Sequence, residues 1–346
     1  MKKEQRTEIS SLGEFGLIDR LTKDISLKNT SSIKGIGDDA AIIQAEKRQV
    51  ITTDILIEGI HFDLVYTPLK HLGYKAIMVN LSDVYAMNAF PKQVLVSFGI
   101  SNRFSVEAID EIYAGMKLAC QRYQVDIVGG DTTSSPQGLV ISVTAIGEQS
   151  FEKIAYRNGA KEGDLLCVSG DLGAAYMGLK ILQREKQVFL NAPEASIELD
   201  KFTYIVERQL KPEARKDIIQ FFDTEQLVPT SMIDISDGLS SEILHICQQS
   251  NVGCTLEEEH VPIANETYDT ALSLNIDPIT CALNGGEDYE LLFTINPKDK
   301  AIVDKNHDIA IIGEITDALL GIKLHTKGGN YHDIIAMGWD GMKKNV

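Results

Sequence analysis

The sequence predicts a mixed α/β protein of about two domains. Strand-like and helix-like segments alternate along its length, which is typical of α/β and α+β proteins. The chain has 346 residues, and at roughly 150 residues per domain this length favours two domains, each with its own core. A polar, glycine-bearing stretch at residues 156–164 (YRNGAKEGD) predicts their junction. We therefore expect an N-terminal domain over residues 1–150 and a C-terminal domain over residues 151–346.

In the first domain, short apolar runs predict strands, and longer segments with apolar residues on one face predict helices. The predicted strands are residues 50–56, 93–100, 126–128 and 139–147. The predicted helices are residues 70–89 and 105–123. Because residues 126–128 lead directly into Gly129, Gly130 and Asp131, we expect a turn after this short strand.

The second domain continues the alternation. Its predicted strands are residues 165–169, 232–235, 290–295, 310–315 and 322–325. Its predicted helices are residues 174–183, 202–210 and 239–249, and the polar residues 191–198 predict a surface loop. No low-complexity tract and no repeat period is present.

The chain is strongly acidic. Its 50 Asp and Glu residues against 33 Lys and Arg residues give a formal net charge of −17 at pH 7. Binding to a phosphate backbone needs a basic face, so this balance excludes a general affinity for nucleic acid. It equally disfavours docking on anionic lipid. Partners that are themselves anions must be bound through cations.

Nothing in the sequence predicts export or a membrane span. No apolar segment follows the charged N-terminus, so we expect no signal peptide, and no run approaches the ~20 apolar residues of a membrane helix. The five cysteines are scattered without a C-x-x-C pair, which is typical of reduced thiols rather than of a disulfide framework or a zinc site. We therefore expect a cytoplasmic protein.

Acidic clusters beside glycine, serine or threonine recur at turns and strand ends. They are GIGDDAAI (35–42), TTD (52–54), NLSD (80–83), GGDTT (129–133), DISDG (234–238) and GGEDYEL (285–291). Glycine lets a backbone approach a ligand closely, and Mg²⁺ prefers carboxylate and hydroxyl oxygens. In DISDG, Asp234 and Asp237 close an apolar strand before a helix, where α/β proteins usually bind ligands. The clusters therefore predict sites for divalent cations.

Each cluster also has a structural interpretation, because Asp beside Gly is common in turns and Ser or Asp before a helix is an N-cap. Their number favours function, since an acidic surface that serves only solubility has no reason to gather at glycine turns. Two alternatives stay open. A tight turn with close helix packing accounts for GDLGAA (170–175) at least as well as phosphate binding does. His61, seven residues after Asp54, is by default a surface histidine.

Several common catalytic motifs are absent from the sequence. It has no Gly-Lys dipeptide and hence no Walker A loop, no kinase-type HRD, no HExxH and no GxSxG. GDLGAA lacks the G-x-G-x-x-G spacing of a dinucleotide-binding fold, and DISDG lacks the spacing and the final Glu of an EF-hand. A nucleotide would therefore have to be bound without a P-loop.

The ordered motifs GIGDDAA, TTD followed by His61, VNLSD, GGDT, GD-LL-VSG-LGAA, DISDGL and GGEDYELLFT resemble those of bacterial thiamine-monophosphate kinases. That family belongs to the superfamily of aminoimidazole ribonucleotide synthetase, selenophosphate synthetase and a hydrogenase-maturation protein. The resemblance runs from Glu14-Phe15 to Gly338-Trp339 and so covers almost the whole chain. The TTD-to-histidine spacing, NLSD, GGEDYEL and the terminal Gly-Trp point to the thiamine branch.

The resemblance implies ATP-dependent phosphorylation of thiamine monophosphate to thiamine diphosphate, by direct in-line transfer assisted by several Mg²⁺ ions. It implies the two-domain fold of aminoimidazole ribonucleotide synthetase. In that fold the N-terminal domain binds ATP and Mg²⁺ and forms a shared β-barrel in a homodimer, and the C-terminal domain is α/β. The implied partners are ATP, thiamine monophosphate and a second copy of the chain, with no nucleic acid and no membrane.

The resemblance also implies roles for individual residues. The implied Mg²⁺ ligands are Asp38, Thr52, Thr53, Asp54, Asp83, Asp131, Asp234 and Asp237. The implied ATP contacts are Tyr113, Gly130, Asp131, Arg157 and Ser236. The implied contacts with thiamine monophosphate are His61, Glu287 and Trp339, the last as a stacking surface for an aromatic ring. Without the resemblance, Trp339 is interpreted as a terminal packing residue, and Tyr113 lies in a predicted helix with no motif around it.

At three places the sequence departs from the family pattern. Asn88 stands where glycine is usual, so we expect different local packing there. Ser241 and Glu242 stand where an aspartate is common, and Asp340-Gly341 follows the terminal Gly-Trp in place of His-Phe. None of these departures removes an implied metal ligand.

Three other functions remain as alternatives. One is a different ATP-dependent reaction of the same superfamily, although the N-terminal stretch has no cysteine to support selenophosphate synthesis. Another is a sensor that binds Mg-ATP without turnover, which substrate-dependent release of ADP would distinguish from a kinase. The third is a structural acidic protein, disfavoured because the clusters coincide with glycine turns.

Overall fold

The computed structural model describes residues 7–37, 40–192, 194 and 198–336. The chain divides into two units. Unit 1 comprises Met1–Val84 and Phe90–Phe151, and unit 2 comprises Tyr85–Ala89 and Glu152–Val346.

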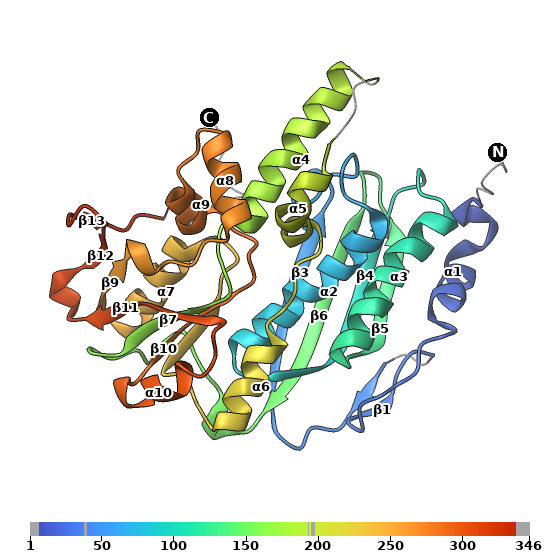
Figure 1. Cartoon of the computed structure of the whole chain (residues 1–346). Helices are drawn as coiled ribbons and strands as arrows, with labels where there is room; N and C mark the ends of the chain where they lie inside the picture. The colour runs from blue at the N-terminus through green and yellow to red at the C-terminus, as the bar shows by residue number, and fades with distance from the viewer. Residues whose placement is uncertain (1–6, 38–39, 193, 195–197, 337–346) are drawn as a thin grey trace. The chain divides into compact units, whose positions relative to one another are not determined.

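Unit 1 is built on a four-stranded sheet in the order β3-β6-β4-β5. These strands are β3 (Arg48–Ile57), β6 (Val140–Gln149), β4 (Phe90–Ile100) and β5 (Asp126–Ser134). Strand β6 is antiparallel to both β3 and β4, and β5 is parallel to β4. Helices α2 (Leu69–Ala86) and α3 (Val106–Tyr123) lie across one face of this sheet (Figure 1).

The two faces of this sheet differ because side chains alternate along each strand. On the helix-covered face, Val96 and Phe98 are buried, and the Phe98 ring stacks on Tyr113 of α3 with ring centroids 5.5 Å apart. On the other face, Ile51 and Ile55 of β3 are 63% and 49% exposed. Unit 1 therefore has one covered apolar face and one open face that carries exposed isoleucines.

The N-terminal elements of unit 1 are η1 (Ile9–Ser11), α1 (Gly13–Thr22), β1 (Ser32–Lys34) and β2 (Ile42–Ile43). The buried carboxylate of Asp126 holds this segment to the start of β5. It accepts hydrogen bonds from Lys28 N at 2.7 Å, Asn29 N at 2.9 Å and Ser32 Oγ at 2.7 Å. Three donors on one carboxylate compensate for the cost of burying its charge.

Unit 2 contains a seven-stranded sheet in the order β13-β12-β9-β11-β7-β10-β8. Its strands are β13 (Tyr331–Asp333), β12 (Ile322–His325), β9 (Gly253–Glu257), β11 (Ile309–Thr316), β7 (Leu165–Ser169), β10 (Leu291–Ile295) and β8 (Ser231–Asp234). All neighbouring strands are antiparallel except the parallel pair β12 and β9.

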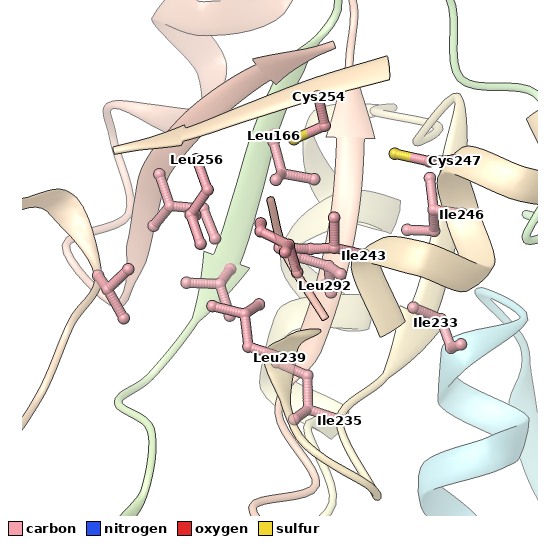
Figure 2. Packing of buried hydrophobic residues seen from close by; sticks show 14 of the residues in the cluster. Leu166, Ile233, Ile235, Leu239, Ile243, Ile246, Cys247, Cys254, Leu256 and Leu292 are labelled. Atoms are coloured by element: carbon pink, nitrogen blue, oxygen red, sulfur yellow. The ribbon is translucent and has the colours of Figure 1, made fainter. Parts of the chain in front are cut away.

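Helix α7 (Leu239–Ser250) supplies the main core of unit 2. Figure 2 shows Ile243 of α7 packed among side chains from the strands, including Leu166 of β7 and Leu292 of β10. The opposite face of β10 is covered by α6 (Lys216–Glu225), where the rings of Phe222 and Phe293 meet edge to face with centroids 5.0 Å apart. Neighbouring residues of a strand point to opposite faces, so Leu292 packs toward α7 and Phe293 toward α6. Helices therefore cover both faces of this sheet.

A second cluster of buried residues joins α4 (Ala174–Asn191), α5 (Thr203–Leu210), α8 (Asn265–Ser273) and α9 (Pro278–Asn284). The remaining elements are α10 (Lys300–Val303) and the 3₁₀ turns η2 (Phe151–Lys153), η3 (Asp200–Phe202), η4 (Glu258–His260), η5 (Pro297–Asp299) and η6 (Ala318–Leu320). No helix among the described residues is long and apolar enough to cross a membrane. The five cysteines are free and buried.

The predicted strands and helices are present within a few residues of their expected bounds, with two differences of consequence. Helix α4 continues to Asn191, beyond the predicted residue 183, and so covers the start of the predicted polar loop. The turn predicted at Gly129, Gly130 and Asp131 is wrong, because β5 continues through these residues to Ser134. A Cβ atom at Gly130 would lie 1.8 Å from the carbonyl oxygen of Val96, so glycine here permits close approach to β4 rather than a turn.

Candidate active site

In unit 1, Asp54 of β3 and Asp83 of α2 form a carboxylate pair. Burial is the larger cause that raises the pKa of Asp54, to about 6, and the negative charge of Asp83 is the second. Thr52, two residues before Asp54 on the same face of β3, donates from Oγ1 to Asp83 Oδ2 at 2.5 Å. A divalent cation relieves an arrangement in which one carboxylate raises the proton affinity of another.

The Asn80 side chain holds the backbone of Asp54. Its side chain is buried, its Oδ1 accepts a hydrogen bond from Asp54 N at 3.1 Å, and its Nδ2 donates to Ala76 O at 3.1 Å. Asn80 and Asp83 are three residues apart on α2 and therefore share one face of the helix. The NLSD motif thus contacts β3 at two points, through the amide of Asn80 and the carboxylate of Asp83.

The implied ligand Thr53 lies on the other face of β3. Its hydroxyl donates to Val143 O at 3.1 Å and accepts from Thr144 Oγ1 at 3.0 Å. Because neighbouring residues of a strand point to opposite faces, its side chain is separated from those of Thr52 and Asp54.

Gly130 and Asp131 lie on β5, at the opposite edge of the sheet from β3. Asp131 is exposed, pairs with Ser97 of β4, and its Oδ1 accepts a hydrogen bond from Thr132 N at 2.8 Å. Along the sheet Asp131 is three strand spacings from β3, so unit 1 does not bring it to the Asp54–Asp83 pair through strand pairing.

Tyr113 and His61 have defined surroundings in unit 1. Tyr113 is buried in α3 against Phe98, and burial raises the pKa of its phenol to about 12. His61 follows β3, and its Nδ1 accepts a hydrogen bond from Ile57 N at 3.1 Å. That bond requires an unprotonated Nδ1, so Nε2 carries the proton of the neutral ring.

In unit 2, the implied residues of DISDG lie where β8 ends. Asp234 is buried and pairs with Leu291 of β10, whereas Ser236 and Asp237 are exposed in the turn before α7. Arg157 is also exposed, and the adjacent Tyr156 accepts a hydrogen bond through its carbonyl oxygen from Met232 N of β8 at 2.8 Å. The segment that carries Arg157 therefore runs beside the strand that ends in Asp234.

Glu287 is brought to the same turn by backbone pairing. Its N–H donates to Ser236 O at 2.8 Å, and its carboxylate accepts from Gln209 Nε2 at 2.6 Å. A Cβ atom on Gly286 would lie 2.2 Å from Ser236 O, so glycine is needed for this approach. Glu287 and Tyr289 both have a positive φ, which is uncommon for residues other than glycine and is found often at functional sites.

The structure at the start of α4 decides between a structural turn and phosphate binding for GDLGAA (170–175). The buried Asp288 carboxylate accepts hydrogen bonds from Gly173 N at 2.7 Å and Ala175 N at 3.3 Å. Burial, opposed by nearby Arg208 and by these N–H groups, raises the pKa of Asp288 to about 7. A carboxylate of the chain thus occupies the N–H groups that a phosphate would use, which favours the structural interpretation.

A buried ionic network supports the segment that leads from Glu287 into β10. Glu290 accepts hydrogen bonds from Ser169 Oγ at 2.6 Å and Arg208 Nη1 at 2.8 Å, and also from Arg215. Arg208 additionally donates to Asp171 O at 2.9 Å. This network fixes the start of β10 beside the end of β7.

Two implied residues, Asp38 and Trp339, lie outside the described residues. Among the residues that are described, no three or more His, Cys, Asp or Glu side chains gather as a cation site. The implied ligands instead include the Asp54–Asp83 pair in unit 1 and the carboxylates of DISDG, at and just after the end of β8, in unit 2. Mg²⁺ is commonly bound through one or two carboxylates, with substrate phosphates and water completing its shell.

Sequence reasoning assigned no role to Asn80, Glu242 or Asp288. The signal for Asn80 was available, because its three-residue spacing from Asp83 places both on one helical face. Glu242 was visible only as a departure from the family. It is buried, and its Oε1 accepts hydrogen bonds from Ser236 N at 3.0 Å and Asp237 N at 2.8 Å.

Comparison with known proteins adds independent information. Residues 37–149 match the model of the AIR synthase related protein N-terminal domain, and residues 161–323 match that of the C-terminal domain. The thiamine-monophosphate kinase of Aquifex aeolicus (strain VF5) is 38% identical over 294 residues, which are 84% of this chain and 88% of that relative. The chain belongs to the thiamine-monophosphate kinase family. The Bacillus subtilis (strain 168) member is 33% identical over 83% of this chain and 85% of its own.

Solved structures of the same family agree. AaThiL complexed with AMPPCP and TMP is 34% identical with a TM-score of 0.74, over 98% of this chain and 99% of that one. The thiamine-monophosphate kinase of Stenotrophomonas maltophilia K279a is 31% identical with a TM-score of 0.77, over 94% and 98% of the two chains. The hydrogenase maturation protein HypE in complex with ATP, at 20% identity and a TM-score of 0.74, has the same fold. The predicted α/β fold of the aminoimidazole ribonucleotide synthetase type and the family resemblance are confirmed.

Proposed function

We propose that this chain transfers the γ-phosphoryl group of ATP to the phosphate of thiamine monophosphate and so forms thiamine diphosphate. Membership of the thiamine-monophosphate kinase family supports this proposal. The structural observation that carries it is the Asp54–Asp83 pair, in which burial and the negative charge of Asp83 raise the proton affinity of Asp54. A site of this kind suits a reaction between two polyanions that cations must bring together.

The acceptor in this reaction is already a phosphate anion, so the protein needs no strong general base to make it nucleophilic. The main difficulty is repulsion, because two unit charges ~4 Å apart repel by about 4 kcal/mol at an effective dielectric constant near 20. We propose direct in-line transfer with no phosphorylated enzyme intermediate. The chain's own residues then align the two substrates and hold the cations.

The donor atoms of the described residues fit Mg²⁺, since they are carboxylate and hydroxyl oxygens. We propose that Asp54, Asp83 and Thr52 in unit 1 and Asp234 and Asp237 in unit 2 hold Mg²⁺. The family motifs add Asp38, Thr53 and Asp131 to the proposed set, of which the Thr53 side chain faces away from Asp54 and Asp131 lies at the opposite edge of the sheet. When bound, the ions would neutralise the phosphate oxygens and orient them for in-line displacement.

The substrate contacts remain those implied by the family motifs. We propose that Tyr113, Gly130, Asp131, Arg157 and Ser236 contact ATP, and that His61, Glu287 and Trp339 contact thiamine monophosphate. The tautomer of His61 supports its role, because a proton on Nε2 makes this atom a donor to a phosphate oxygen. The glycine-dependent approach of Gly286 to Ser236 supports the grouping of Glu287 with the DISDG turn.

We further propose a homodimer in which the open face of the unit 1 sheet is covered by a second copy. Ile51 and Ile55 on this face are 63% and 49% exposed, and two exposed isoleucines on the same face of an edge strand favour a partner. In this proposal residues 1–150 form the ATP-binding, Mg²⁺-binding and dimerisation domain, and residues 151–346 form the α/β domain. A cytoplasmic location is proposed from the five free, buried cysteines.

Incubation with ATP, Mg²⁺ and thiamine monophosphate, followed by chromatography, tests the proposed reaction. We expect thiamine diphosphate and an equal amount of ADP, and neither product when EDTA is present. No thiamine diphosphate above the control without enzyme would refute the kinase activity. Binding of Mg-ATP without release of ADP would instead support a nucleotide sensor.

A further inference from the structure

Glu242 bonds to the turn that precedes its own helix. It lies in the first turn of α7, is 2% exposed, and its Oε1 accepts hydrogen bonds from Ser236 N at 3.0 Å and Asp237 N at 2.8 Å. A residue that caps a helix satisfies N–H groups of the helix itself. These two N–H groups come before Gly238, the residue that precedes the first helical residue of α7, Leu239. Glu242 therefore serves the turn rather than the helix.

The turn is held from a second side as well. Ser236 O accepts a hydrogen bond from Glu287 N at 2.8 Å. The N–H groups of Ser236 and Asp237 are thus bound by Glu242, while the carbonyl group of Ser236 is bound by Glu287. The side chains of Ser236 and Asp237 nevertheless remain exposed. The Ser236 hydroxyl also donates to Glu242 Oε1 at 3.5 Å. The fold thus fixes the backbone of this turn while its two polar side chains stay exposed.

The second oxygen of Glu242 indicates that stability is not the reason for a carboxylate here. Its Oε2 is buried and has no hydrogen-bond partner among the described residues. An unpaired buried acceptor costs free energy, and a glutamine would present the same carbonyl oxygen to the two N–H groups at a lower desolvation cost. What the turn requires is an acceptor of this length at this position.

We infer that Glu242 is a positioning residue for the proposed kinase reaction: by holding the N–H groups of Ser236 and Asp237, it sets the two exposed side chains for binding of Mg-ATP. Glu242 does not itself touch the substrates in this role. The inference rests on the proposed function only in the identity of the ligand. Residues that orient ligand-binding groups typically change affinity or activity by about 10- to 100-fold when removed.

Three variants test this role. Glu242→Met keeps the length and volume of the side chain but removes the acceptor, and Glu242→Gln restores an acceptor oxygen. Asp277→Ala is the matched control, because the exposed Asp277 also accepts a hydrogen bond from a backbone N–H, from Ile279 at the start of α9. It therefore loses a comparable bond in the same unit at a different helix.

The main measurement is the Kd of a non-hydrolysable ATP analogue with Mg²⁺, by calorimetry, beside the thermal midpoint of each ligand-free variant. We expect a Kd about 10- to 100-fold higher for Glu242→Met. We expect a Kd within about 3-fold of wild type for Glu242→Gln, as a retained acceptor requires, and an unchanged Kd for Asp277→Ala. If Glu242→Met does not fold, Glu242→Leu, which also lacks an acceptor, replaces it with the same expected direction.

Wild-type affinity in the folded acceptor-less variant would overturn the inference. So would an equal loss in Glu242→Gln, because charge rather than the position of an acceptor would then be responsible. Kinetics separate this result from a failure of the proposed function. Wild-type protein that binds Mg-ATP but forms no thiamine diphosphate refutes the kinase reaction and leaves the binding test of Glu242 valid, whereas wild-type protein that binds no Mg-ATP overturns both.

Discussion

The hydroxyl of Thr52 donates a 2.5 Å hydrogen bond to Asp83 Oδ2 and so joins strand β3 to helix α2. Two residues further along the strand, the backbone N–H of Asp54 donates to Asn80 on the same helix. These two bonds bring the carboxylates of Asp54 and Asp83 near each other at the cost of mutual repulsion. Such a pair destabilises the metal-free protein and gains stability when a cation binds.

Replacement of Asp54 by Asn is expected to abolish turnover while the fold stays intact. The substitution removes one charge of the repelling pair, so the metal-free thermal midpoint should equal or exceed that of wild type. The rise in thermal midpoint on adding Mg²⁺ with an ATP analogue should become much smaller. Differential scanning fluorimetry and the chromatographic assay check both effects.

The exposed residue Asp24, also in unit 1, provides the control for this variant. Asp24→Asn changes the net charge equally and should leave both the activity and the Mg²⁺-dependent shift as in wild type. Near-normal activity of Asp54→Asn would contradict the assignment of Asp54 as a metal ligand. Loss of both properties in Asp24→Asn would attribute the effect to net charge.

Replacement of Asn80 by Ala is expected to weaken both the fold and the cation site. It leaves the Asp54 N–H without its acceptor, which costs about 1–3 kcal/mol when the donor stays buried. Urea denaturation should show this loss of unfolding free energy, and the Mg²⁺-dependent thermal shift should fall with it. Ser82→Ala, buried on the same helix, is the control. An unaltered Mg²⁺ response in Asn80→Ala would leave Asn80 a purely structural residue.

The sequence predicted elements with a clear pattern, such as the apolar strand that became β7 and the amphipathic helix that became α3. It failed at Gly130, because a glycine that permits a close approach between strands has the same local signature as a glycine that forms a turn. The backbone conformation explains why asparagine can replace glycine at position 88. Asn88 has a positive φ, which suits glycine and is tolerated by asparagine. In that position the family's usual glycine and this residue meet the same backbone requirement.

The sequence could predict which candidate residues lie together mainly where they are close in the chain. Asp234 ends β8, and Ser236 and Asp237 follow it in the turn before α7, as DISDG indicated. The network of Glu290 with Arg208 and Arg215 had no local signal, since its members are 82 and 75 residues apart. Side chains alternate between the two faces of a strand, so the Thr53 side chain lies on the other face of β3 from those of Thr52 and Asp54. This could be predicted only once the limits of β3 are known.

Asp288 makes part of the stability of the protein depend on pH. Its pKa is raised to about 7 in the folded chain, chiefly by burial, against about 3.9 for an unfolded Asp. Between these values the folded state binds the proton more tightly, so the contribution of this group to stability is largest at low pH and is lost as pH rises toward 7. The thermal midpoint of wild type should therefore exceed that of Asp288→Asn by a larger amount at pH 5 than at pH 8. A constant difference would mean that the folded-state pKa of Asp288 is not raised.

The proposed dimer gives the last prediction, since Ile51 and Ile55 are exposed on the open face of the unit 1 sheet. Lysine at both positions should abolish self-association, because burying two ammonium groups in an apolar interface costs several kcal/mol. Light scattering after size-exclusion chromatography should then give the mass of one chain in place of two. Leu319→Lys, at a leucine that is 95% exposed in unit 2, should keep the wild-type mass. If wild type has the mass of one chain, or the double variant that of two, this face is not the interface; a shift in both variants would reflect added charge instead.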